Sequence, residues 1–231
     1  MHRFRIIVGS LFFFACIHGS FAETPSSSND ENVLRSHSGL ESTAWGRDWL
    51  KYIVRCALPA GSSIDVAHDG TSDRLDGAFG LAPQWKHAAL DDAGKRWVSA
   101  CVLGFVNVLG VHVLISMRGD NANLRATVSE TERRDFAFQE AAFYGDIFAD
   151  PPTTFVCRGR GGPRTSPVRD KRLCSDPSER AGISRCEMII AGDCSAVCTE
   201  EDPRDHAYRG CRGGDRVFDE VVTVFLPMAT E

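Results

Sequence analysis

The sequence predicts an α+β fold, in which a helical and mixed N-terminal part precedes a disulfide-rich C-terminal part of strands and loops. Three observations predict it. Apolar residues recur at helical spacing in two segments before residue 110, and short β-like runs without that spacing follow Pro151-Pro152. Six of the nine cysteines lie between Cys157 and Cys211. Crowded cysteines outside the cytosol usually form disulfides, so they also predict an oxidising compartment.

The first 22 residues have the pattern of a secretory signal peptide. A positively charged start is followed by an apolar run over 6–17 and by a small-residue cleavage site that ends at Ala22. The apolar run is shorter than the roughly 20 residues that a membrane-spanning helix needs. We expect cleavage near Ala22; a lipid anchor on Cys16 and a retained helix are the alternatives.

The charge of the chain argues against nucleic acid as a partner. The formal net charge is −5 at pH 7, and loss of the leader removes Arg3 and Arg5 and makes the chain more acidic. An acidic protein is repelled by polyanions. No later segment is long and apolar enough to cross a bilayer. We therefore expect a secreted, periplasmic or cell-envelope protein with no transmembrane span after cleavage.

Composition divides the remaining chain into three parts. Residues 23–42 are rich in Ser, Asn and acidic side chains and predict a flexible tether, because they offer almost no large apolar surface to bury. Residues 43–150 form the α+β part, and residues 151–231 form the cysteine-rich β and loop part. Pro151-Pro152 marks the boundary between them.

Two longer helices are expected in the α+β part. The first ends at Pro59, and the second is capped by Asp91 and ends before Gly110. Ser129 and Glu132 have capping-box spacing and predict a third, short helix. The apolar faces of the longer helices comprise Trp45, Trp49, Ile53 and Cys56 in the first, and Trp97, Cys101, Phe105 and Val108 in the second.

Several runs have the length and composition of strands. Residues 63–66 and 75–79 flank an Asp-Gly turn signal, and residues 111–117 are an apolar run in which His112 is expected to be a hydrogen-bonded core residue. Residues 221–226 are the strongest strand of the cysteine-rich part, because β-branched residues dominate them. Weaker candidates are 154–156 and 188–190.

Eight cysteines follow the leader: Cys56, Cys101, Cys157, Cys174, Cys186, Cys194, Cys198 and Cys211. Cys56 and Cys101 are predicted to pair, since each lies on the apolar face of a helix and both lie outside the C-terminal cluster. The other six should form three bridges, for which fifteen connectivities exist. A zinc site of Cys194, Cys198 and His206 is the alternative. The oxidising compartment favours disulfides, so no metal and no cofactor are expected.

No sequence motif names a reaction. A nucleophile elbow, a metalloprotease helix and a phosphate loop are all missing from the sequence. Glu140 and Asp146 flank Phe143 and Tyr144, and carboxylates among aromatic rings are typical of glycan-cleaving or sugar-binding grooves. These two carboxylates are weak catalytic candidates, and Trp85 is a candidate stacking surface for a ligand. In the alternative interpretation the aromatic residues are core, and Glu140 satisfies a buried donor or an arginine.

A basic stretch follows the Pro-Pro boundary. Arg158, Arg160 and Arg164 are its candidate binding residues, because guanidinium groups suit carboxylate, phosphate and sulfate. The expected partner is an anionic envelope component or a glycan. A solvated loop is the alternative. The stretch also contains Arg169, Lys171 and Arg172.

Five sequence strings resemble those of an uncharacterised family of exported, cysteine-containing bacterial proteins. They are Tyr52 to Pro59, Gly80 to Pro83 with Trp85, Arg96 to Cys101, Ile115 to Gly119, and Glu140 with Phe143 to Gly145. The resemblance covers about residues 45 to 226. It implies export and paired cysteines, and it implies no activity.

Together these observations predict a secreted or cell-envelope binding or structural module without enzymatic activity. The alternative is a secreted hydrolase that acts on glycans through Glu140 and Asp146. The distance between the two carboxylates decides between them, because glycoside hydrolases hold their carboxylate pair about 5–10 Å apart.

Overall fold

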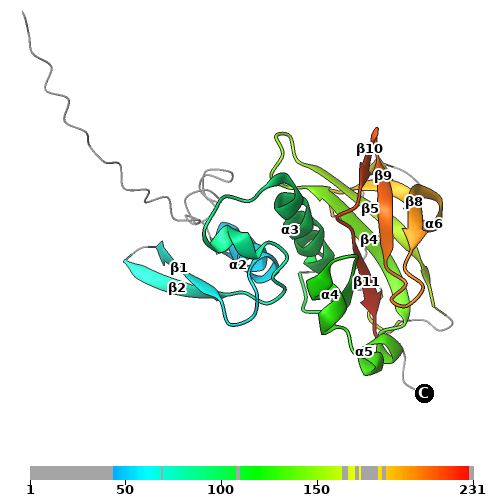
Figure 1. Cartoon of the computed structure of the whole chain (residues 1–231), viewed down its shortest axis with the longest axis horizontal. Helices are drawn as coiled ribbons and strands as arrows, with labels where there is room; N and C mark the ends of the chain where they lie inside the picture. The colour runs from blue at the N-terminus through cyan, green and yellow to red at the C-terminus, as the bar shows by residue number, and fades with distance from the viewer. Residues whose placement is uncertain are drawn as a thin grey trace, which may run out of the picture.

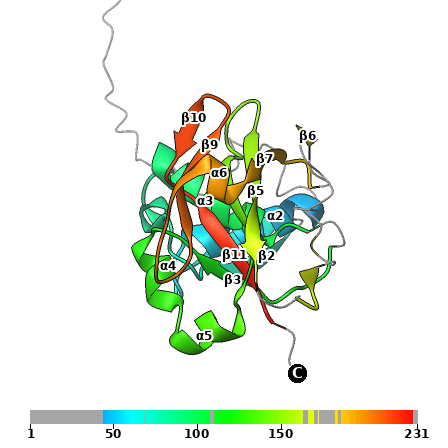
Figure 2. The ribbon, with the colours of Figure 1, turned by 90° about the vertical axis from the view of Figure 1, so that its right-hand side faces the viewer.

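Helices cover one face of a six-stranded sheet, and a three-stranded sheet covers the other face (Figures 1 and 2). The structure, a computed structural model, describes residues 44–68, 70–107, 110–162, 166–169, 172, 182–183 and 186–228. The predicted leader and tether, Arg164 and Cys174 lie outside the described residues. The α+β fold is confirmed.

The six-stranded sheet has the order β3-β11-β4-β5-β7-β6. Its strands are β3 (Ser116–Arg118), β11 (Val222–Leu226), β4 (Phe138–Asp146), β5 (Thr153–Gly161), β7 (Ile189–Asp193) and β6 (Gly182–Ile183). Only β5 and β7 pair in parallel among these described strands. Because β4 pairs with β5 across the Pro151-Pro152 segment, the two parts predicted from composition share one sheet.

The side chains of strand β4 contribute to two cores, one on each face of the sheet. Ala141 and Phe143 belong to the core under the helices, whereas Ala142 and Tyr144 belong to the core under the second sheet. Successive side chains of a strand point to opposite faces, so a central strand between two layers is covered on both faces. Eight of the nine residues of β4 are accordingly buried.

Helices α2 (Ala44–Ala57) and α3 (Asp92–Phe105) form the helical layer, with α3 against β4 and α2 against α3. The predicted cap is present, since Asp91 accepts a hydrogen bond from the Gly94 amide at 2.7 Å. A disulfide joins Cys56 of α2 to Cys101 of α3, with 5.9 Å between the Cα atoms, which is the pair that the two helical faces predicted.

A two-stranded hairpin of β1 (Ser63–His68) and β2 (Thr71–Asp76) follows α2. Figure 1 shows it on the side of the helices away from the sheets. The short 3-10 helix η1 (Pro83–Lys86) then leads toward α3. The hairpin agrees with the Asp-Gly turn signal of the sequence.

The apolar run 111–117 differs from the prediction. Only its last residues join β3, which pairs with β11, while residues 111–115 form an irregular segment. The Asn107 side chain closes that segment, because it both donates to the Val111 carbonyl (2.9 Å) and accepts from the Val111 amide (3.1 Å). His112 is exposed, so its prediction as a core residue was wrong: it lies in the irregular segment, before the residues that pair with a described strand.

Two short helices, α4 (Ala122–Thr127) and α5 (Glu130–Asp135), follow β3. The Ser129 hydroxyl accepts from the Glu132 amide at 3.1 Å, so the predicted N-terminal cap is present. No helix in the described ranges is long and apolar enough to cross a membrane.

The second sheet has the order β10-β9-β8 and carries disulfides. Its strands are β8 (Cys198–Glu201), β9 (Tyr208–Gly213) and β10 (Arg216–Phe218), and the one-turn helix α6 (Cys194–Val197) precedes it. Cys157 is bonded to Cys194, and Cys198 is bonded to Cys211. Cys186 is also disulfide-bonded. The rings of Tyr144, Phe155 and Phe218 pack beside these bridges, with centroids 5.5–5.7 Å apart.

Candidate functional site

A cavity of about 770 Å³ lies between α2, the C-terminal end of α3, and Gly110 with the irregular segment 111–115. Its described lining also includes Arg172, Cys186 and Glu187. A volume of this size is within the range of about 300–1,000 Å³ that small-molecule sites occupy. The cavity is therefore the strongest candidate binding site among the described residues.

One wall of the cavity is aromatic. Tyr52 of α2 stacks obliquely on Phe105 of α3, with 5.1 Å between the ring centroids, and Trp49 lies one turn before Tyr52. Helix α2 is amphipathic: Leu50, Ile53 and the residues in register with them face the core, which leaves Tyr52 on the cavity side with 39% of its surface exposed.

A second group of lining residues is aliphatic and partly exposed. Val111, Val113 and Ile115 line the cavity, and Leu114 beside them is 65% exposed. Exposed apolar side chains that gather on a surface are typical of interaction sites. Both groups of lining residues offer apolar contact to a ligand.

Cationic side chains lie along the α2 edge of the cavity. The Arg55 guanidinium sits 5.9 Å from the centroid of the Phe105 ring, and among the described residues it has no carboxylate at ion-pair distance. Lys51, one turn earlier, is 3.7 Å from Asp48. Arg55 is therefore a cation that a ligand can neutralise.

A buried ion pair forms one side of the cavity. Arg172 lines the cavity, and its Nε atom donates to both carboxylate oxygens of Glu140 at 3.1 and 3.0 Å. Its Nη2 atom donates to the Gly104 carbonyl of α3 at 2.8 Å. Burial raises the pKa of Glu140, and the Arg172 guanidinium opposes that rise.

A β-bulge explains why Glu140 faces the helices. The register of β4 against β5 shifts between Gln139 and Ala141. Gln139 points to the second sheet, where it donates to the His206 carbonyl at 2.7 Å, and the extra residue turns Glu140 toward α3. Bulges commonly re-aim one side chain in this way.

The two predicted catalytic carboxylates do not form a pair. Glu140 and Asp146 lie six positions apart on one strand, which separates them by about 20 Å at a rise of about 3.3 Å per residue. The Asp146 carboxylate accepts a hydrogen bond from the Phe148 amide at 2.8 Å, and the Glu140 carboxylate is ion-paired with Arg172. The separation contradicts a glycosidase pair of Glu140 and Asp146, and the alternative interpretation of Glu140 as the partner of an arginine is correct.

Arg158 and Arg160, the two described members of the predicted binding set, are both ion-paired. Arg158 and Arg160 lie on strand β5, not in a loop. Arg158 donates to Asp193 at 3.0 Å, and Arg160 forms an ion pair with Glu201. These long-range partners were invisible in the local sequence, so the predicted binding role of the two arginines has no support in their geometry.

Trp85 is a core residue. It is 1% exposed, and its indole Nε1 has no hydrogen-bond partner among the described residues. A ligand cannot stack on a side chain that is covered in this way. The prediction of Trp85 as a binding surface was therefore wrong, because a lone Trp after a Gly-Leu-Ala-Pro loop does not reveal whether the loop folds inward.

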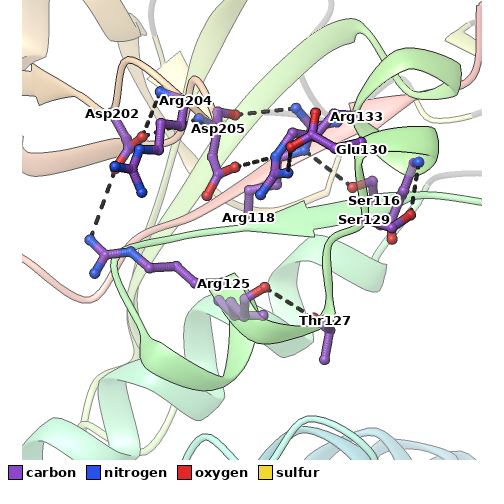
Figure 3. A network of polar contacts seen from close by, with 12 residues as sticks. Ser116, Arg118, Arg125, Thr127, Ser129, Glu130, Arg133, Asp202, Arg204 and Asp205 are labelled. Carbon is purple, nitrogen blue, oxygen red and sulfur yellow. Dashed lines mark hydrogen bonds and ion pairs between the residues drawn. The ribbon is translucent and has the colours of Figure 1, made fainter.

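Arg118 is the centre of a second polar cluster, which Figure 3 shows. It is buried, donates to the carbonyls of Asp205 (3.2 Å) and Phe136 (2.6 Å), and lies 3.8 Å from the Phe225 ring centroid. Burial lowers the pKa of Arg118 to about 10. Arg133 donates to the Asp205 carboxylate at 2.6 Å. Arg118, Arg133 and Asp205 all form hydrogen bonds within the protein. We therefore interpret this cluster as a structural contact that joins α5, β3 and the segment before β9.

The sequence patterns did not lead us to predict Tyr52, Phe105 and Arg55 as a site, although the helical spacing of Tyr52 and Arg55 indicated one. Tyr52 and Arg55 are three residues apart on one side of a helix whose apolar face is complete without them.

No protein-family model, curated protein or solved structure matches the chain. The resemblance to exported bacterial proteins therefore stays a prediction.

Proposed function

We propose that this protein is an exported binding module without enzymatic activity, and that it binds an anionic amphipathic component of the cell envelope in the α2–α3 cavity. The observation that carries this proposal is the combination of Arg55, which has no described carboxylate partner, with aromatic and aliphatic walls in one cavity of about 770 Å³. The disulfides and the predicted leader support export.

The lining assigns a position to each part of such a ligand. The apolar body contacts Tyr52, Phe105 and Val113, because burial there removes apolar surface of both partners from water. The anionic group lies at the α2 edge beside Arg55. The Arg55 guanidinium is exposed and lies 5.9 Å from the Phe105 ring centroid, so it can contact an anionic group while the apolar body packs on the aromatic wall.

The proposal of a binding role without catalysis is supported by the state of the candidate carboxylates. Glu140 is neutralised by Arg172, and Asp146 lies about 20 Å along the strand from it. A general acid and a nucleophile or base have to meet at one substrate bond. Neither carboxylate can serve that role together with the other.

Calorimetric titration of the oxidised protein with three twelve-carbon probes tests the proposal. The probes are dodecanoate, dodecanol and dodecyltrimethylammonium, each below its micelle concentration. We expect dodecanoate to bind most tightly, and Arg55→Gln to weaken dodecanoate about threefold to tenfold while leaving dodecanol unchanged. Arg74→Gln, on the exposed hairpin, is the matched control and should change neither.

Two outcomes would contradict this function. Equal affinity for dodecanoate and dodecanol, or equal affinity of Arg55→Gln and the parent for dodecanoate, would remove the anionic site. Absence of binding for all three probes, with Tyr52→Ala indistinguishable from the parent, would remove the cavity as a ligand site.

A further inference from the structure

Two disulfides lie in contact with each other in the second core. Cys157–Cys194 joins β5 to α6, and Cys198–Cys211 joins β8 to β9. The Sγ atoms of Cys157 and Cys198 are 3.8 Å apart, although these two residues are not bonded. The Sγ atoms of Cys157, Cys198 and Cys211 all lie within 4.8 Å of one another. This proximity places each bridge within reach of a sulfur of the other.

The four cysteines differ in burial. Cys157, Cys194 and Cys211 are completely buried, whereas Cys198 is partly exposed. Disulfides are opened by a thiolate that attacks one sulfur, so access decides which sulfur reacts first. A thiol from solution therefore meets Cys198 before the other three.

We propose that these four cysteines form an internal thiol–disulfide exchange centre, whose co-substrate is a dithiol. A thiolate of the dithiol attacks Sγ of Cys198, which breaks the Cys198–Cys211 bond and releases Cys211 as a thiol. The second thiol of the dithiol then attacks the dithiol sulfur of the mixed disulfide. The oxidised dithiol leaves, and Cys198 is released as a thiolate.

The exchange step follows inside the protein. The Cys198 thiolate attacks Sγ of Cys157, a Cys157–Cys198 bond forms, and the Cys157–Cys194 bond breaks to release the Cys194 thiolate, which takes up a proton. The protein has then gained two electrons and two protons, held as the thiols of Cys194 and Cys211. The dithiol has lost the same two electrons and two protons in becoming a disulfide.

The geometry requires little movement for this step. A disulfide needs about 2.05 Å between its sulfurs, so the two atoms have to approach by less than about 2 Å. Rotation of a cysteine side chain between staggered rotamers moves Sγ by more than that. The exchange transfers the covalent link of β5 from α6 to β8, and it frees the Cys194 end of α6.

The Cys56–Cys101 bridge is an internal control. It lies in the core under the helices, and both of its cysteines are completely buried. It belongs to a different core from the exchange centre, so it should stay intact while the centre reacts.

Partial reduction of the oxidised, unmodified protein tests the proposal. One equivalent of dithiothreitol is added with EDTA present, the reaction is quenched with acid, and free thiols are alkylated in denaturant before peptide mapping by mass spectrometry. We expect a peptide linked through Cys157 and Cys198, with alkylated Cys194 and Cys211. Two-electron-reduced protein that contains alkylated Cys198 and Cys211 and no Cys157–Cys198 link would overturn the proposal.

A pair of double variants provides an independent measurement. C194S/C211S retains the two contacting cysteines, and we expect glutathione disulfide to oxidise them to a Cys157–Cys198 bond. C157S/C198S retains the other two and is the matched control, which should keep free thiols or bind glutathione. Free thiols at Cys157 and Cys198 in folded C194S/C211S protein would count against the exchange; if that variant does not fold, the partial-reduction map decides.

Discussion

Removal of the Cys56–Cys101 bridge should cost this protein a large share of its stability. The bridge joins the two helices of the helical layer across 45 positions of sequence. In the chain-entropy description, opening a loop of that length lowers the free energy of unfolding by about 4 kcal/mol at 25 °C, because the unfolded chain regains conformations that the bridge excluded.

The C56A/C101A variant is suited to this measurement. Both positions are completely buried among apolar residues, so alanine leaves no unpaired polar group behind. Urea unfolding followed by far-UV circular dichroism gives the free energy of unfolding, and a thermal scan should show a lower Tm by about 8–16 °C. The other bridges are kept, and mapping of the unreduced protein checks that they have not rearranged.

A loss of less than about 1 kcal/mol, with the same dependence on urea as the parent, would refute this reasoning. It would mean that the unfolded chain stays compact around α2 and α3 without the bridge, because residual structure in the unfolded state removes the entropy that the bridge otherwise restricts.

Three further predictions concern single side chains. Arg172→Met leaves the buried Glu140 carboxyl without its partner and raises the pKa of Glu140 further, so the folded protein binds a proton more tightly than the unfolded chain. The loss in the free energy of unfolding should therefore be small at pH 4 and reach about 3–5 kcal/mol at pH 8. Urea unfolding at both pH values measures it. Adding Glu140→Gln should restore most of that loss at pH 8, and an equal loss at both pH values would contradict the ion pair. Ser129→Ala removes the cap of α5 and should cost about 1 kcal/mol in the same assay; no change would contradict the cap. Tyr144→Phe removes a hydrogen bond of 2.9 Å to the Arg212 carbonyl and should cost about 1 kcal/mol, and an unchanged midpoint would show that water replaces the hydroxyl.

Short-range patterns in the sequence determined the helices and their ends. Asp91 caps α3 and Ser129 caps α5, because a cap depends on an amide only three residues away. The pairing of Cys56 with Cys101 also followed from local patterns, since the helical spacing placed each cysteine on a face that had to be buried. The α+β class followed from the same periodicities and from the cysteine distribution.

Only the tertiary structure decided which charged groups meet. Arg158 finds Asp193 through the parallel pairing of β5 with β7, and Arg172 finds Glu140 because a bulge turns that side chain toward α3. The sequence shows a run of cations there, but ion pairs depend on strand register, and a register shift of one residue moves a side chain to the other face.

Packing between distant parts of the chain decides two further features. These are the irregular segment 111–115 and the contact between Cys157 and Cys198. An apolar run becomes a strand only where a neighbouring strand supplies hydrogen bonds, and β11 does so only from Ser116 onward. The cysteine pairs were open among fifteen connectivities until β5, α6, β8 and β9 came together. The sequence by itself therefore determined the local elements, and packing between segments far apart in the chain decided the cavity and the sulfur cluster, because both are made of contacts that no local pattern encodes.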